Sequence, residues 1–403
     1  MKRIYLQKAR NQIARPNTIR DINRQIVLSY IRERTPISRA DIARETNLQR
    51  SSVSSIVDSL QMAGLIEEIG SGKSSGGRKP TLLKLKSGTP VALGVDITPR
   101  NITIAISDLT GKVLDKEVLP ISPDVDFITG QILHEISKLI DRHPEVTDEL
   151  EVGISIPGIT DQTRSESLYI PYFQWSNWDI SSQITKKFGL PVTIDNDANA
   201  IALAELWFGH EKIRKYSNFI TVLIGEGVGT GMIFDGQVYR GDHGAAGEFG
   251  HMTVGVNGPV QCSCGSYDCW EAHASEKAII ARYHKLHSGH VTNAAGTNIS
   301  QLVELANIGE ESALGALRET ARYLGVGLSN LIVGLSPQAI VVSGAITKAW
   351  DLISDEVQSV AERSIRHDLP KTVLMPSSLG ENPTLIGALS LVLARKFASA
   401  NYN

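Results

Sequence analysis

Cysteine is scarce in this chain, with three among 403 residues, and nothing else in the sequence suggests a disulfide-stapled secreted protein. Apolar runs of about 20 residues, the length that spans a bilayer, are lacking as well. Residues 1–8 carry charge, but no apolar run follows them as it would in a signal peptide. The sequence therefore predicts a cytoplasmic protein without a membrane segment, and its length suggests two or three domains.

The three cysteines and one histidine lie within a short segment, residues 251–269. These residues are His251, Cys262, Cys264 and Cys269. Three thiolates and one imidazole complete the tetrahedral shell of a structural Zn²⁺, with no position left for water. One alternative is three ordinary buried cysteines, but the segment around them is polar and rich in turn residues. A disulfide is the other, and it would leave one thiol over.

Acidic residues are few in the N-terminal part of the chain. Residues 1–89 hold 17 Lys and Arg against 7 Asp and Glu, a net charge of +10. The remainder holds 23 basic and 36 acidic residues, a net charge of −13. We call residues 1–89 the head and the remainder the body. A basic head on an acidic body indicates that the head binds a polyanion and that the body does not. A solvated basic tail is the alternative, and the pattern within the head decides between them.

Residues 18–86 resemble a winged helix-turn-helix closely. The predicted elements are helices at residues 18–34, from 38 to a turn at 47–48, and at 49–63, followed by strands at 65–69 and 82–85. Apolar residues recur at helical spacing in the helices, and Ser38 is a good N-cap for the second one. A flexible basic loop at residues 70–80 joins the two strands as the wing.

The exposed face of the third helix opens with short polar donors and one arginine, without an acid until Asp58. These residues are Gln49, Arg50, Ser51, Ser52, Ser54 and Ser55. They suit base edges and phosphates, and the resemblance implies that they enter the major groove of double-stranded operator DNA. It also implies that Arg78 and Lys79 lie near the minor groove or the backbone. A three-helix protein-interaction module is the alternative, but the charge asymmetry favours DNA.

The acidic body reads as two related α/β lobes with a cleft between them. A meander of three strands, a helix and a buried strand occupy residues 91–156, and a similar order begins again after residue 216. We expect three domains. These are residues 1–89, the winged helix with its linker; 90–200, a first lobe completed by the C-terminal helix at 384–400; and 201–383, a second lobe with the zinc site and an oligomerisation surface.

Linked motifs in the body resemble those of the ROK family, named for repressors, open reading frames and kinases. A glycine-spaced stretch runs from Ile224 to Met232 and continues through Gly241 to the segment Gly247–His251. The cysteines follow directly, then Glu271, while Asp195–Ala200 matches the sugar-site segment of the family. The resemblance covers residues 91–403 and implies the actin-like sugar-kinase fold, which is RNase H-like.

The resemblance implies a monosaccharide effector held in the interlobe cleft. The residues that match the sugar positions of the family are Asn196, Asp197, Glu248, His251 and Glu271. Carboxylates and amides are the groups that fix several hydroxyls at once. His251 would serve both zinc and sugar, because the metal fixes its tautomer and its neighbours. Gly158, Trp175 and Trp178 are candidates to line the same cleft, although tryptophan is more often a core residue.

The sequence argues against phosphoryl transfer. In kinases of the family Asp197 would be the general base, but their first phosphate loop, Asp-x-Gly-Gly-Thr, corresponds here to Asp96-Ile97-Thr98-Pro99-Arg100. The glycines are absent, Pro99 has no N–H, and Glu226 brings negative charge to the second loop. We therefore expect no catalytic residue, with weak activity through Thr98 and Arg100 left open.

Three hypotheses follow from these patterns. The first is a sugar-responsive repressor of carbohydrate genes that binds a palindromic operator as a homodimer or homotetramer. The second is an active ATP-dependent sugar kinase with a DNA-binding head. The third, a regulator that has lost sugar binding and answers to a protein partner, is disfavoured by the intact sugar residues. Glucose, xylose and N-acetylglucosamine would all use these groups, and the sugar could act as inducer or co-repressor.

Overall fold

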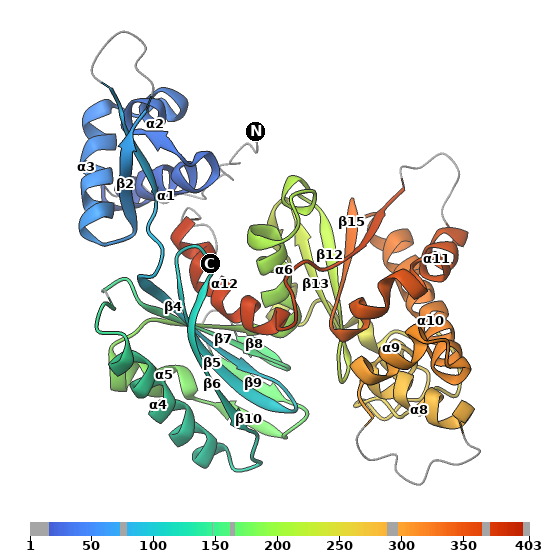
Figure 1. The fold of residues 1–403 in the computed structure, drawn as a ribbon. Helices are drawn as coiled ribbons and strands as arrows, with labels where there is room; N and C mark the ends of the chain where they lie inside the picture. Colours follow the sequence, from blue (N-terminus) through green and yellow to red (C-terminus); the bar gives the residue numbers. More distant parts are fainter. Residues whose placement is uncertain are drawn as a thin grey trace.

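The computed structural model describes residues 16–72, 79–146, 148–161, 166–287, 297–364 and 371–397. A small N-terminal domain sits on two larger α/β lobes, and helices α6 and α12 lie between the lobes (Figure 1). No helix within the described ranges is long and apolar enough to cross a membrane.

The N-terminal domain is a winged helix-turn-helix, as predicted. Its elements are α1 (Pro16–Arg34), β1 (Ile37–Ser38), α2 (Arg39–Thr46), α3 (Arg50–Met62), β2 (Ile66–Ser71) and β3 (Thr81–Leu85). Ser38 caps α2, since its hydroxyl accepts a hydrogen bond from the Asp41 N–H at 3.2 Å. The two-residue strand β1, which the sequence pattern did not reveal, pairs with β3 in a sheet of order β1-β3-β2.

The first lobe is a five-stranded mixed sheet of order β11-β7-β4-β5-β6. Its elements are β4 (Pro90–Ile97), β5 (Asn101–Asp108), β6 (Val113–Pro120), α4 (Val125–Arg142), β7 (Glu151–Ile156), α5 (Ile180–Phe188) and β11 (Val192–Asn196). A separate antiparallel sheet follows β7, built from β8 (Ile159–Asp161), β9 (Glu166–Ile170) and β10 (Trp175–Trp178).

The second lobe repeats the topology of the first, with a sheet of order β14-β13-β12-β15-β16. Its strands are β12 (Phe219–Ile224), β13 (Val228–Phe234), β14 (Gln237–Val238), β15 (Ala339–Ser343) and β16 (Val373–Pro376). Its helices are α7 (Trp270–Ala274), α8 (Glu276–His287), α9 (Ile299–Asn307), α10 (Glu311–Leu335) and α11 (Trp350–Ala361), with 3₁₀ turns η1 (Ile213–Lys215), η2 (Asp242–Gly244), η3 (Glu248–His251), η4 (Ala345–Ala349) and η5 (Glu362–Ser364). The repeated strand order confirms the prediction of two related lobes.

The tryptophans of β10 lie in the core of the first lobe. Trp175 and Trp178 are each 5% exposed. Their indole N–H groups donate to the Pro123 carbonyl at 2.9 Å and to the Thr129 hydroxyl at 2.8 Å. The interpretation of these side chains as lining of the sugar cleft is therefore wrong, because their polar atoms already have partners inside the lobe.

Two central helices, α6 (Asp197–Phe208) and α12 (Pro383–Phe397), join the lobes. The two sheets and the two helices between them pack closely, and three glycines allow this. A Cβ at Gly153 in β7 would lie 2.0 Å from the Ala388 oxygen of α12, and one at Gly387 in α12 would lie 3.0 Å from Ala200 of α6. On the other side, a Cβ at Gly231 in β13 would lie 2.1 Å from the Ala198 oxygen. Helix α12 is thus packed on the sheet of the first lobe and α6 on that of the second. The expected domain boundary at residue 200 falls inside α6.

Adding a methyl group between the sheet of the first lobe and helix α12 should destabilise the protein. We expect Gly153→Ala to lower the free energy of unfolding by about 1–3 kcal/mol, because the backbone of Ala388 cannot yield as a side chain can. Gly130→Ala is the matched control, since that glycine lies in α4 with no atom within 4 Å of its Cβ position. There the substitution should be neutral or stabilising by up to about 1 kcal/mol. Urea denaturation compares the two variants, and equal stability would contradict the packing argument.

Candidate functional site

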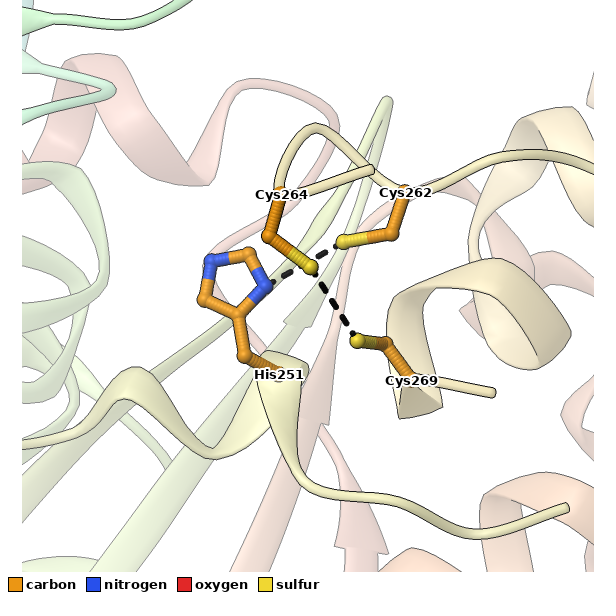
Figure 2. Close-up of side chains that lie close together, drawn as sticks. All are labelled: His251, Cys262, Cys264 and Cys269. Atoms are coloured by element: carbon orange, nitrogen blue, oxygen red, sulfur yellow. Dashed lines mark hydrogen bonds between the residues drawn. The ribbon is translucent and has the colours of Figure 1, made fainter. Parts of the chain in front are cut away.

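His251, Cys262, Cys264 and Cys269 converge on one point in the second lobe. Figure 2 shows His251 at the end of η3, two cysteines on a tight loop, and Cys269 at the start of α7. The four ligand atoms lie within 4.8 Å of one another, and the Cys264 and Cys269 sulfurs are 3.4 Å apart. A disulfide requires about 2.05 Å, and all three thiols are free. The arrangement suits a tetrahedral metal ion, whose thiolate sulfurs would lie about 3.7 Å apart.

The same loop holds Glu271 in place. The Glu271 carboxylate accepts hydrogen bonds from the Ser263 N–H at 3.1 Å and from the Ser263 hydroxyl at 3.3 Å. Its other oxygen accepts from the Val228 N–H at 3.3 Å. Ser263 lies between two of the clustered cysteines, so any ion that fixes this loop also fixes Glu271.

His251 connects the cysteine cluster to Glu248. Its Nδ1 lies 3.2 Å from the Cys262 sulfur, and its Nε2 lies 3.6 Å from a Glu248 oxygen. One ring nitrogen therefore faces the thiols and the other faces a predicted sugar residue, as the double role of His251 requires.

Asn196 and Asp197 begin helix α6. The Asn196 side chain caps the helix, accepting from the Ala198 and Asn199 N–H groups at 2.9 and 3.3 Å, and it donates to the Gly158 carbonyl at 3.1 Å. Burial raises the pKa of Asp197 to about 7, and the negative charge of Glu248 adds to the rise. The helix start thus presents a carboxyl group poised to ionise near neutral pH.

Tyr172, which no sequence motif marked, reaches this region from the turn between β9 and β10. The pKa of its hydroxyl is raised by burial and then by the charges of Glu271, Asp197 and Glu226, which surround it. A Cβ on Gly227 would lie 2.7 Å from the Tyr172 oxygen and 2.3 Å from a Glu271 oxygen. A residue of the first lobe therefore meets predicted sugar residues of the second. The sequence shows only that Tyr172 stands between Pro171 and Phe173, and this gave no signal that it would reach the site.

Arg100 forms a second contact between the lobes. It lies in the turn between β4 and β5, and its guanidinium pairs with Glu226 at 2.6 Å and with Glu276 at 2.7 Å. Lys277 also pairs with Glu226, at 3.3 Å. Burial acts to raise the pKa of Glu226, but these cations bring it below its ordinary value.

The turn that carries Arg100 uses its own N–H groups. The Thr98 N–H donates to the Asn101 carbonyl at 2.9 Å. The Thr98 hydroxyl accepts from the Arg100 and Asn101 N–H groups at 3.3 and 3.1 Å. Pro99 has no N–H to offer. Residues 98–101 therefore have no spare backbone donor for a phosphate group.

Two cavities of about 460 and 280 Å³ lie away from these residues. They adjoin one another between β6 and α12, share Leu379 and Ile386, and include none of the predicted sugar residues. Among the predicted sugar residues, the His251 Nε2 lies 3.6 Å from a Glu248 oxygen. Arg100 pairs instead with Glu226 and Glu276, which do not belong to that set.

The predicted DNA-binding residues of α3 lie at its cap and in its first two turns. Gln49, Arg50, Ser51 and Ser55 are exposed and Ser52 and Ser54 are half-buried, whereas Val53, Ile56, Val57 and Leu60 are buried. Lys79 is exposed beside the wing, and Arg78 lies outside the described residues. Arg39 of α2, which the sequence analysis did not single out, pairs with Asp58 at 2.6 Å and borders the same helix.

Two family models match the chain: the ROK family over residues 92–395 and the MarR family over residues 26–74. The chain is 34% identical to the xylose repressor of Bacillus spizizenii over 384 residues, which cover 94% of this chain and 97% of that protein.

Solved structures show the same likeness. A ROK family transcriptional regulator, a homologue of the E. coli MLC protein, superposes with a TM-score of 0.79 at 27% identity, covering 94% of this chain and 97% of the other. A ROK family glucokinase from Streptomyces griseus, in complex with glucose and AMPPNP, gives a TM-score of 0.64 at 28% identity, covering 74% and 98%. That kinase matches a smaller part of this chain than the regulator does. The chain belongs to the ROK family and carries a MarR-type winged helix ahead of its ROK domain.

Proposed function

We propose that this protein is a sugar-responsive transcriptional repressor of carbohydrate genes. The winged helix would bind operator DNA in the cytoplasm as a homodimer or tetramer, while a monosaccharide binds between the lobes. One observation carries the proposal: a DNA-binding domain with an exposed polar helix face is joined to a ROK body whose turn at residues 98–101 has no N–H free for phosphate. The likeness to a xylose repressor supports it.

The sugar would be held by the residues that gather around Asp197. We infer that Asn196, Asp197, Glu248, His251 and Glu271 bind its hydroxyls. Glu248 now contacts His251, and Glu271 accepts hydrogen bonds from Ser263 and Val228, so a bound sugar would compete with these contacts. Because Tyr172 and Arg100 of the first lobe contact the second, sugar entry would change the angle between the lobes. Such a change would alter the spacing of two DNA-binding domains in a dimer, a coupling of order 1–3 kcal/mol.

The ion in the cysteine cluster would be Zn²⁺ with a structural role. Three thiolates and an imidazole are the ligands zinc prefers, and they leave no position for a reacting water. The chemistry that such an ion supplies here is charge and rigidity. The chain itself uses that rigidity through Ser263, which orients Glu271, and through His251, which faces Glu248.

The alternative function, a sugar kinase, draws its support from the likeness to the glucokinase and from the presence of Asp197. Two features oppose it. The resemblance implies that Glu226 brings a negative charge to the second phosphate loop, and Arg100 is already paired with Glu226 and Glu276. The first phosphate loop has no spare donor.

Titration calorimetry tests the two functions together. The purified protein is titrated with D-xylose, D-glucose and N-acetyl-D-glucosamine, with and without AMPPNP. We expect one sugar to bind with a micromolar Kd and AMPPNP to give no signal. Nucleotide binding that tightens with sugar would place the kinase function first instead.

Removing a ligand of the cysteine cluster should abolish sugar binding. We expect Cys264→Ser to lose bound zinc, from about one ion per chain, and to lower the free energy of unfolding by several kcal/mol. Glu271 would then no longer be oriented. Metal analysis and calorimetry measure both effects, and Ser263→Ala is the control that removes one hydrogen bond to Glu271 but retains the ion. Full zinc content and normal sugar binding in Cys264→Ser would refute the metal site.

Replacing Asp197 by Asn should weaken sugar binding by about 10- to 100-fold, because a hydrogen bond to a charged acceptor is lost. Operator binding without sugar should not change. Since the pKa of Asp197 is raised to about 7, wild-type affinity for sugar should increase as the carboxylate ionises, by up to about tenfold from about pH 6 to about pH 8. Calorimetry over this range should show a flat profile for Asp197→Asn. Asp351→Asn, exposed on α11, controls for the loss of one charge. A sugar Kd unchanged in Asp197→Asn would remove Asp197 from the site.

Arg50→Ala should weaken operator binding by about 1–3 kcal/mol and leave sugar binding intact, because Arg50 is exposed at the first turn of α3. Fluorescence anisotropy with a labelled operator gives the Kd at several salt concentrations. Arg322→Ala removes the same charge from an exposed site in the second lobe and should change the Kd little. Equal effects of the two variants would mean that only net charge matters.

A further inference from the structure

The winged helix contacts the body of the protein mainly at the C-terminal ends of α6 and α12. Its buried core is continuous with Leu389, Leu393 and Phe397 of α12. The Ser29 hydroxyl donates to the Phe397 carbonyl at 2.7 Å, and the Gln25 amide donates to the Arg395 carbonyl at 3.1 Å. The DNA-binding domain is therefore docked on the two helices that join the lobes (Figure 1).

Arg32 of α1 lies at the centre of this contact. Its guanidinium carbon is 5.0 Å from the ring centroid of Trp207, 4.8 Å from that of Phe208 and 4.6 Å from that of Phe397. It also donates to the Trp207 carbonyl. Burial lowers the pKa of Arg32 to about 10, so the side chain remains charged at neutral pH. We call these three rings the aromatic cage. It holds a cation by its ring faces.

The cage is formed by both central helices. Trp207 and Phe208 end α6, whereas Phe397 ends α12. At its other end α6 begins with Asp197, and α12 begins beside Thr384, whose hydroxyl donates to the Asp96 carboxylate at 2.7 Å. Burial raises the pKa of the Asp96 carboxyl group to about 7, and the negative charge of the nearby Asp197 adds to the rise. Each helix thus extends from the proposed sugar site to Arg32.

The geometry of the two helices amplifies a small rotation. Gly387 lies close against Ala200 near the start of both helices, and the cage lies about 11–15 Å further along at 1.5 Å per residue. Helix α6 is packed on the second lobe and α12 on the first, so a change of the interlobe angle turns one helix against the other. A rotation of roughly 10° about this contact would move the cage rings by about 2 Å relative to one another.

We propose that Arg32 couples the sugar site to the DNA-binding domain, by binding the aromatic cage only when the ends of α6 and α12 are correctly spaced. This inference rests on the proposed function and names the residue through which it is regulated. A stacked guanidinium needs its rings at about 5 Å, so a displacement of about 2 Å opens the cage and releases the winged helix from its docked position.

The experiment uses the full-length protein and a labelled operator, with D-xylose as the effector, or N-acetyl-D-glucosamine if the calorimetric panel selects it. The readout is the ratio of operator Kd values with and without sugar, beside the Kd for the sugar itself. We expect Arg32→Ala to reduce this ratio to below twofold while the sugar Kd stays within twofold of wild type. Gln25→Ala is the matched control two turns earlier on α1, because it removes a hydrogen bond to Arg395 of α12 and touches no residue of the cage.

Each other outcome is informative. A wild-type ratio in Arg32→Ala would overturn the coupling role, and so would an equal loss of response in Gln25→Ala, which would show a general docking effect. If Arg32→Ala does not fold, Phe208→Leu decides: a ratio reduced at least threefold supports the proposal and an unchanged ratio overturns it. If the wild type itself shows no sugar-dependent operator binding, the proposed function fails, which is a different result from a failure of Arg32 alone.

Discussion

The close backbone contact between α6 and α12 is the constraint on which the rest of the arrangement depends. Each helix is packed against a different sheet through a glycine in that sheet, Gly153 on one side and Gly231 on the other, and the helices meet at Gly387. Side chains at these positions would push the layers apart. The close packing therefore fixes the distance between the lobes at the helix crossing. Asp197 and the docking surface of the DNA-binding domain are placed at opposite ends of the same helix as a consequence.

The cluster of His251 and the three cysteines imposes a second, local constraint within the second lobe. The proposed ion would be remote from any reacting bond, and its effect would be geometric. Ser263, between two cysteines, fixes the Glu271 carboxylate, and His251 sets the place of Glu248. A loop that would otherwise sample many conformations presents two carboxylates in one arrangement. Selectivity for a sugar depends on such arrangements, because neutral hydroxyls differ only in position.

Local patterns in the sequence predicted most of the fold. Strand runs, helical spacing, the Ser38 cap and the cysteine quartet each depend on residues close together in the chain, and the structure contains all of them. Contacts between distant segments could not be predicted this way. Arg100 and Glu226 are separated by 126 positions, and the approach of Tyr172 to Gly227 depends on a small sheet, β8–β10, that the pattern did not show. Trp175 and Trp178 were misread for the same reason, because their polar partners belong to α4 and the segment before it.

The turn at residues 98–101 has a consequence for how a signal is measured. An enzyme that phosphorylates its ligand consumes the quantity it detects, and its output follows flux and the supply of ATP. A repressor of the proposed kind, whose loop donors are all satisfied internally, would leave the sugar unchanged and release it again. Its occupancy would then follow the concentration of free sugar alone and reverse when that concentration falls. Gene expression would report the size of the sugar pool and not the rate at which the sugar is used.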